Sequence, residues 1–330
     1  MNRFAPILFS FLLLLSYEIN SQQTEKRFIS LPLTEGVALN QTYDMVQGSK
    51  GFIWFGTLYG LVRYDGKDIK VYQTNRDDST SISFNDIISL HADADSNLWI
   101  GTWGGGLNCL RKNSDIFKRY MYDPEDYVGI SDNIVWAITE DAVGNIWVAT
   151  GTGKLNKLNK KNGKFRWIDV FTDSTFSGKR VTVNSLYYEN QYSIWIGHNY
   201  GLSRYDPETE KVEHYVLKSK GDEENGDIPV HTIKKDEFSN LWIGTNSGLF
   251  RLNRVENKFY PVESTKDYVV FSVLPQSNGN IWCGTNKGIL IFNPETDEKQ
   301  IISSDNSAGS IPGNFVKKII KIKDAFFIKI

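Results

Sequence analysis

The chain has 330 residues, of which 40% are hydrophobic and 13% aromatic, and it contains only 2 cysteines. This composition excludes a small disulfide-stapled protein, a disordered tail and a polytopic membrane protein. Lys and Arg number 37 against 39 Asp and Glu, which leaves a formal charge of −2. No long run of one charge sign occurs, so the electrostatic footprint of a nucleic-acid binder is missing. Nucleic acid is therefore not an expected partner of this chain.

The first residues follow the pattern of a secretory signal peptide. Arg3 supplies a positive charge, residues 5–15 are mostly apolar, and the small residue Ser21 precedes Gln22. We therefore predict a signal peptide at residues 1–21, cleaved after Ser21, and an N-terminal segment at residues 22–36. An anchor helix is the alternative, but the apolar stretch is shorter than the ~20 residues that a span needs. No other stretch approaches that length, so we expect an exported chain without a membrane span.

A short motif of the form Ile/Leu-Trp-x-Gly-Thr occurs six times along the chain. Its tryptophans are separated by 45, 48, 48, 47 and 40 residues and are Trp54, Trp99, Trp147, Trp195, Trp242 and Trp282. A glycine follows each tryptophan six residues later, at Gly60, Gly105, Gly153, Gly201, Gly248 and Gly288. A period of this length, made of short β-rich runs, is typical of propeller blades.

Each repeat divides into four short strands. In the fifth repeat the pattern predicts strands A to D at residues 231–236, 240–245, 248–252 and 258–262. The predicted fold is all-β, a β-propeller of four-stranded blades, with six complete blades over residues 37–313. The repeated tryptophans are interpreted as structural residues that pack one blade against the next.

The motifs resemble those of a known family. The segment from Asp141 to Trp147 reads Asp-x-x-Gly-Asn-Ile-Trp, and the repeats continue as Trp-Ile-Gly-Thr-x-x-Gly-Leu-x-Arg-Tyr. Over residues 37–293 the sequence is thus similar to the two-component regulator propeller repeat. Ala149 in place of Gly and His198 in place of Thr are local departures, interpreted as drift between blades.

This resemblance implies the N-terminal periplasmic sensor region of a hybrid two-component histidine kinase. Such a receptor is expected to carry two seven-bladed propellers, a small β-sandwich, an inner-membrane span, a kinase core, a receiver domain and a DNA-binding domain. These receptors commonly sense glycans. The phosphorelay parts have no counterpart in this sequence, so we interpret the chain as truncated.

The C-terminal residues 314–330 are predicted to form a partial seventh blade. Residues 314–320 match a strand A, and residues 326–330 match a degraded strand B in which Ile328 stands where Trp is expected. Residues 28–33 are a candidate ring-closing strand for the same blade.

Chain reversal at each strand places the B–C turns and the D–A connections on one face of a propeller. Two side chains in each B–C turn vary between repeats, and aromatic rings beside amides suit a neutral sugar. The predicted ligand-binding residues are Tyr59, Trp103, Asn199, Tyr200, Asn246, Asn286 and Lys287. Asn also favours turns for its own conformation, so a structural role stays open for the asparagines.

Other chemistry finds little support in the sequence. Four histidines, at positions 91, 198, 214 and 231, show no ligand spacing, and the acidic run at residues 222–227 lacks the spacing of a calcium loop. We expect no metal, no cofactor and no catalytic residue. Cys109 and Cys283 fall in blades that are not neighbours, so two free thiols are predicted.

The sequence therefore predicts a non-enzymatic sensory propeller that binds an oligosaccharide or another small molecule. In the intact receptor its partners would be the second propeller and a second copy in a homodimer. A periplasmic carbohydrate-active propeller enzyme and a protein-interaction scaffold are the alternatives.

Overall fold

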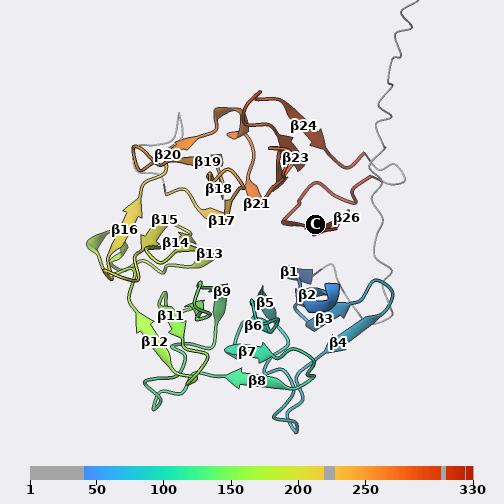
Figure 1. Cartoon of the computed structure of the whole chain (residues 1–330), viewed down its shortest axis with the longest axis vertical. Coiled ribbons are helices and arrows are strands. Elements are labelled where there is room, and N and C mark those ends of the chain that lie inside the picture. Colours follow the sequence, from blue (N-terminus) through green and yellow to red (C-terminus); the bar gives the residue numbers. More distant parts are fainter. Residues whose placement is uncertain (1–40, 219–226, 306–309, 324, 330) are drawn as a thin grey trace, which may run out of the picture.

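The computed structural model describes residues 41–218, 227–305, 310–323 and 325–329. They form six four-stranded antiparallel sheets and one two-stranded sheet, arranged as blades around a central axis (Figure 1). The all-β propeller predicted from the sequence is confirmed. The predicted signal peptide, the segment 22–36 and the candidate strand at residues 28–33 lie outside the described residues.

Each blade runs from its inner strand A to its outer strand D in chain order. The first three blades contain, in this order, β1 (Thr42–Gln47), β2 (Ile53–Thr57), β3 (Gly60–Tyr64) and β4 (Ile69–Tyr72); β5 (Ile87–Ala92), β6 (Leu98–Thr102), β7 (Leu107–Leu110) and β8 (Phe117–Tyr120); β9 (Val135–Glu140), β10 (Ile146–Thr150), β11 (Leu155–Leu158) and β12 (Phe165–Ile168).

The next three blades contain β13 (Val183–Asn190), β14 (Ser193–His198), β15 (Gly201–Tyr205) and β16 (Val212–Tyr215); β17 (Val230–Lys235), β18 (Leu241–Thr245), β19 (Gly248–Asn253) and β20 (Lys258–Pro261); β21 (Val270–Pro275), β22 (Ile281–Thr285), β23 (Gly288–Phe292) and β24 (Lys299–Ile302). The last sheet pairs β25 (Lys318–Ile322) with β26 (Ala325–Lys329). Three short 3-10 turns are η2 (Ser49–Gly51), η3 (Ser174–Phe176) and η4 (Glu263–Thr265). In the fifth blade every strand lies within one residue of its predicted limits.

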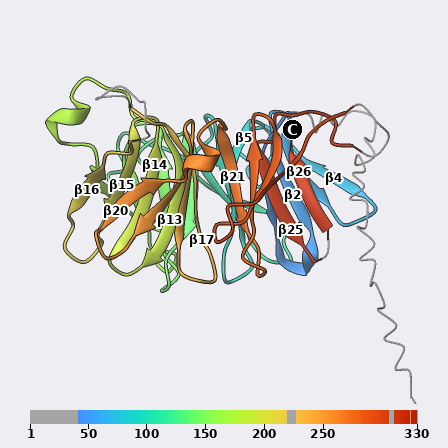
Figure 2. The same cartoon turned by 90° about the horizontal axis from the view of Figure 1, so that it is seen from above.

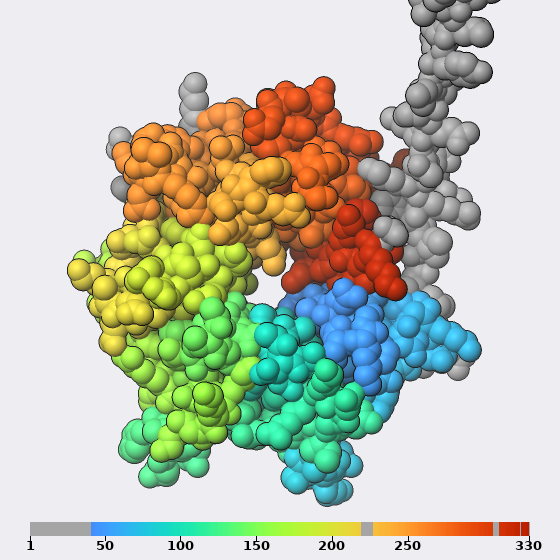
Figure 3. All heavy atoms as spheres, in the orientation of Figure 1, coloured from blue at the N-terminus to red at the C-terminus, as the bar shows by residue number. Residues whose placement is uncertain are grey.

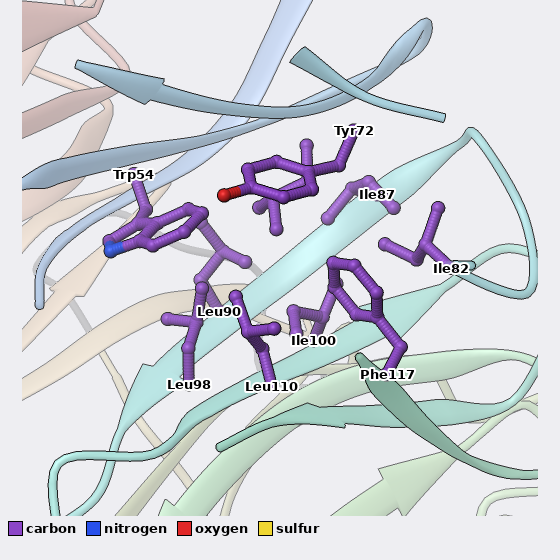
Figure 4. Close-up of a cluster of buried hydrophobic side chains, with 10 residues drawn as sticks. Trp54, Tyr72, Ile82, Ile87, Leu90, Leu98, Ile100, Leu110 and Phe117 are labelled. Atoms are coloured by element: carbon purple, nitrogen blue, oxygen red, sulfur yellow. The ribbon is translucent and has the colours of Figure 1, made fainter. Parts of the chain in front are cut away.

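The repeated tryptophans pack between blades. All six are buried, and each lies in a cluster that joins its own blade to the next one in the chain. In Figure 4, Trp54 and Tyr72 of the first blade face Leu90, Ile100 and other apolar side chains of the second. Removing such a ring costs about 3–5 kcal/mol, because its cavity cannot close.

The polar residues of the motif explain its spacing. In blades 2 to 5 an acidic residue near the end of strand A accepts a hydrogen bond from the indole Nε1 six residues later, as Asp93 does from Trp99 at 2.8 Å and Asp141 from Trp147 at 2.9 Å. The same acidic side chain also accepts the bonds that form the A–B turn. The carboxylate therefore fixes the turn and the ring orientation together.

The glycine of the motif is required by close approach between blades. A Cβ on Gly244 would lie 2.9 Å from Val270 Cγ1, and one on Gly101 would lie 2.7 Å from Val135 O. In both cases the neighbour is the first residue of the next blade's inner strand. This contact sets how tightly the blades pack.

The B–C turns differ in length from the prediction in two blades. The Thr hydroxyl donates to a carbonyl three residues on in blades 1, 5 and 6, but in blades 2 and 3 it reaches four residues, to Gly106 and to Lys154. Gly105 and Gly153 are therefore not the structural equivalents of the other repeated glycines. The sequence spacing alone missed this because glycine occurs at both positions in blade 2.

The two-stranded sheet closes the ring. It packs against blade 6 through Ile319 and against blade 1 through Ile322, and it lies beside β1 in Figure 1. The Lys318 ammonium forms an ion pair with Asp44, whose second oxygen accepts a hydrogen bond from the Leu90 amide at 2.8 Å. Asp44 thus joins three blades. Figure 2 shows the ring edge-on, with strands running between its two faces, and Figure 3 shows the opening at its centre.

Candidate functional site

The face that carries the B–C turns and the D–A connections, called the turn face below, is built by a repeated backbone bond. In each complete blade the residue after the last residue of strand B donates its amide to the carbonyl of the residue just before strand A. These bonds are Leu58 to Gln41, Trp103 to Asp86, Gly151 to Ile134, Asn199 to Thr182, Asn246 to Pro229 and Asn286 to Val269. The turns are therefore fixed against the inner strands, and the side chains they carry have defined positions.

Three of the predicted ligand-binding asparagines use their side chains to hold these turns. The Asn199 and Asn286 Oδ1 atoms accept the amides of Thr182 and Val269, at 2.9 and 3.0 Å. Pro229 has no amide to donate, and the Asn246 Oδ1 instead bonds His231 Nε2 at 2.7 Å. These oxygens are thus already occupied by protein groups.

The remaining predicted residues are dispersed around the ring. Tyr59 and Trp103 are 48% and 44% exposed on the first two blades. Tyr200 lies 4.6 Å from Lys179 Nζ, and Lys287 Nζ lies over the Tyr268 ring. The structure therefore does not bring the seven predicted residues together at one place.

A repeated β-bulge lies at the turn-face end of strand A, the inner strand of each blade. The register of strand A skips its second residue in all six complete blades, so that residue has no partner on strand B. These second residues are Tyr43, Ile88, Trp136, Asn184, His231 and Phe271. Bulges bend a strand and redirect a side chain, and they are frequent beside functional sites.

Four of the six bulge residues are aromatic or His, and further aromatic side chains contact two of these four. Trp136 contacts Trp103 edge-to-face with ring centroids 4.8 Å apart, and Phe271 lies 5.2 Å from His231 and 4.9 Å from Phe315. We call this set the aromatic rim; it comprises Tyr43, Trp103, Trp136, His231, Phe271 and Phe315.

A carboxylate lies beside the rim. Asp86 has a buried Oδ1 without a hydrogen-bond partner among the described residues, and burial raises the pKa of this carboxyl. Burial and the charge of Asp86 raise the pKa of Tyr43, which shows that the two side chains are near each other. An acceptor next to flat rings is the combination that a sugar or a cation would use. Of the rim, only Trp103 was predicted from the sequence.

A cavity of about 320 Å³ opens between the third and fourth blades. It is lined by the turn at residues 151–153 and by two stretches of the D–A connection, residues 169–172 and 179–181. Its charged lining residues are Asp169, Lys179 and Arg180. The sequence had pointed to this face but not to this connection.

Two histidines come together in blade 4, although the sequence showed no spacing between them. The Tyr200 amide donates to His198 Nδ1, so His198 Nε2 carries the proton and donates to Ser203 Oγ at 2.9 Å. The hydroxyl then donates to His214 Nδ1 at 2.7 Å, and His214 Nε2 lies 3.3 Å from Asp173 Oδ2. Ser203 is 0% exposed, so its hydroxyl is not accessible to a substrate.

Burial is the main cause of the titration behaviour of this histidine pair. It lowers the pKa of His198 to about 3, with a smaller contribution from His214. Burial also lowers the pKa of His214, against the opposing effect of Asp173. Phe171 and Phe176 pack against both imidazole rings. The two histidines are therefore neutral. They form a hydrogen-bonded link between the strands of blade 4 and the D–A connection that carries Asp173.

An acidic group on the opposite face has the spacing of a metal site. The carboxylates of Asp93, Asp95 and Glu140 lie close together, but the Lys160 ammonium lies among them, at 3.1, 2.7 and 2.9 Å. The lysine already supplies the positive charge, so this cluster joins two blades as an ion network. Cys109 on β7 and Cys283 on β22 are both buried and unbridged.

Comparisons with known proteins agree with this architecture. A family model described as two component regulator propeller matches residues 81–104 and 129–152. Histidine kinase P4 of Formosa agariphila is 38% identical over 80 residues, which cover 24% of this chain and 6% of that protein. The chain therefore spans a small part of the curated relative it matches.

Solved structures share the fold. The extracellular domain of the hybrid two component system BT3049 from B. thetaiotaomicron is 24% identical with a TM-score of 0.78, over 91% of this chain and 40% of that one. A virginiamycin B lyase from Staphylococcus aureus is 14% identical with a TM-score of 0.65, over 91% and 94%. The fold is thus shared by sensor domains and enzymes. Among the described residues, no helix is long and apolar enough to cross a membrane.

The repeat motif, the six four-stranded blades and the family match agree: the chain is a β-propeller, and its residues 81–104 and 129–152 match the two component regulator propeller model.

Proposed function

We propose that this chain is the periplasmic ligand-binding propeller of a hybrid two-component receptor and that its aromatic rim binds a carbohydrate. The similarity to extracellular domains of such systems supports the sensor role. The signal peptide predicted at residues 1–21 supports export to the periplasm. A second propeller and a second copy of the chain would be its partners in the receptor.

The observation that carries the carbohydrate proposal is the delivery of aromatic side chains by β-bulges. A purely structural bulge needs no particular side chain, yet Tyr43, Trp136 and Phe271 occupy this position, at the turn-face end of the inner strand. Flat rings stack on the CH faces of sugars, and the adjacent Asp86 carboxylate can accept hydrogen bonds from hydroxyls.

A ligand acts on such a receptor only through its different affinity for two states. A rim formed by several blades at once is suited to this, because a sugar lying across it contacts more than one blade. Binding would then favour one spacing of the inner strands over another. We propose this difference as the signal that the receptor transmits.

Calorimetric titration of the chain with a panel of oligosaccharides tests the proposal. Trp103→Ala should weaken binding about fivefold or more, because a stacking ring contributes roughly 1 kcal/mol or more. Phe238→Ala is the matched control, since Phe238 is 66% exposed in an A–B turn on the opposite face. Equal affinity of the two variants, or release of sugar products by the wild type, would overturn the proposal.

A further inference from the structure

The cavity between blades 3 and 4 has the size of a small-ligand site. Its volume of about 320 Å³ lies in the range of ligand pockets, roughly 300–1,000 Å³. It opens on the turn face, because the B–C turn at residues 151–153 and the D–A connection at residues 169–181 form its walls. It is separate from the opening at the centre of the ring, which the inner strands line.

Among the described residues, the positive groups around the cavity are not fully compensated by carboxylates. The one acidic lining residue, Asp169, is already bound by the Lys154 ammonium. Lys179 has a long ion pair to Asp227, at 3.5 Å, and lies over the Tyr200 ring. The Arg180 guanidinium has no hydrogen bond or ion pair within the described part of the chain, while its backbone carbonyl is held by Asn199 Nδ2 at 3.2 Å. Among the described residues, Arg180 is therefore held only through its backbone carbonyl.

The rest of the lining suits a sugar ring. Phe171 supplies an aromatic wall, and its position is set by the packing of Phe176 and the two histidines against it. Thr152 adds an exposed hydroxyl on the opposite wall. The face of a sugar ring can stack on Phe171, and a sugar hydroxyl can form a hydrogen bond with Thr152. Lys179 and Arg180 can then bind an anionic substituent of the same sugar.

The cavity adjoins the aromatic rim through one residue. Ile134 forms a β-bridge with Trp103 of the rim, and its carbonyl accepts the amide of Gly151, which lines the cavity, at 2.9 Å. A saccharide longer than one unit can therefore contact both places.

We propose that this cavity is a subsite for a sugar unit carrying a carboxylate or sulfate, held by Arg180 and Lys179. The inference rests on the proposed function and narrows its ligand to an acidic oligosaccharide. Arg180 presents a planar pair of donors that matches either oxyanion, and Lys179 adds a point charge. The rim then stacks the neighbouring unit of the same ligand.

The test compares three probes by calorimetry: trigalacturonate, a sulfated galactose trisaccharide and the neutral galactose trisaccharide. Arg180→Gln and Lys179→Gln remove the two cations, and Arg111→Gln is the matched control, because Arg111 is exposed in the C–D turn of blade 2 on the opposite face. Thermal melting verifies that each variant folds.

The expected result is that at least one acidic probe binds more tightly than the neutral one. Arg180→Gln should weaken that probe about tenfold or more, while Arg111→Gln changes nothing. The acidic probe that responds identifies carboxylate or sulfate as the group recognised. Equal binding of neutral and acidic probes, with no effect of Arg180→Gln, would overturn the subsite and leave the carbohydrate-binding function standing. Failure of every oligosaccharide to bind would instead overturn the function itself.

Discussion

The buried His198 should make this propeller sensitive to mild acid. Its side chain is 2% exposed, and burial lowers its pKa from 6.5 to about 3. The unfolded chain therefore takes up a proton near pH 6.5, whereas the folded chain resists until far lower pH. The stability that His198 contributes is complete above pH 6.5 and is lost as the pH falls from 6.5 toward 3.

The size of this loss follows from the shift. Each pH unit between the two pKa values costs about 1.4 kcal/mol, so at pH 5 the loss from His198 alone is about 2 kcal/mol. The other groups that face the imidazole belong to the same network: His214, Ser203 and, beyond His214, Asp173. Most carboxylates stay ionised above pH 5, so they contribute little over this interval.

The assay is urea unfolding at pH 7 and pH 5 for the wild type and for His198→Thr. Thr is the residue found at this position in the other five complete repeats, where its hydroxyl donates to a turn carbonyl, as Thr245 does to Gly248 at 2.8 Å. The variant starts from lower stability because it leaves space beside Phe176, but only the change between the two pH values matters. The wild type should lose about 2 kcal/mol more than the variant. His91 and His231 are present in both chains, so an equal loss in the two would refute the assignment of acid sensitivity to His198.

Two further predictions concern the packing of the blades. Gly244→Ala should destabilise the fold by about 1–3 kcal/mol in urea unfolding, because the new Cβ would lie 2.6 Å from Thr232 Cγ2 and 2.9 Å from Val270 O; an unchanged midpoint would show that the blades are not in tight contact. Asp44→Ala should destabilise the fold by about 1–2 kcal/mol more than Asp44→Asn, because only the side-chain oxygen of Asn can still accept the hydrogen bond from the Leu90 amide. Equal losses in the two variants would assign the effect to the ion pair with Lys318.

The sequence predicted the blades well because the repeat serves packing. The tryptophan and the acidic residue six positions before it form the same hydrogen bond in blades 2 to 5, as Trp147 and Asp141 do, so their spacing recurs and can be read without a structure. The short C-terminal sheet was expected with strands at residues 314–320 and 326–330, whereas its strands are β25 (Lys318–Ile322) and β26 (Ala325–Lys329). Its closing contacts could not be predicted, since Asp44 and Lys318 are 274 residues apart.

The candidate site was harder to predict because it depends on the bulge. Alternation along strand A assigns the second residue to a sheet face, whereas the bulge leaves that residue unpaired. Tyr43, Trp136 and Phe271 are therefore not among the residues predicted from the sequence, which lie in the B–C turns. The signal that could have found them is the aromatic or His residue that recurs just before the small third residue of strand A.

The departure from the repeat at His198 lies next to Phe171, which lines the cavity, and its burial gives it meaning. Thr at the end of strand B has a hydrogen-bonding role in five blades, so a buried His198 in its place must satisfy different partners. It does so through Ser203 and His214, and the two rings fix Phe171 as the wall of the cavity. Random substitution at an exposed position would not produce a buried hydrogen-bonded network of this kind. The replacement of Thr by His is therefore better understood as part of shaping the connection that carries Arg180 than as random variation between blades.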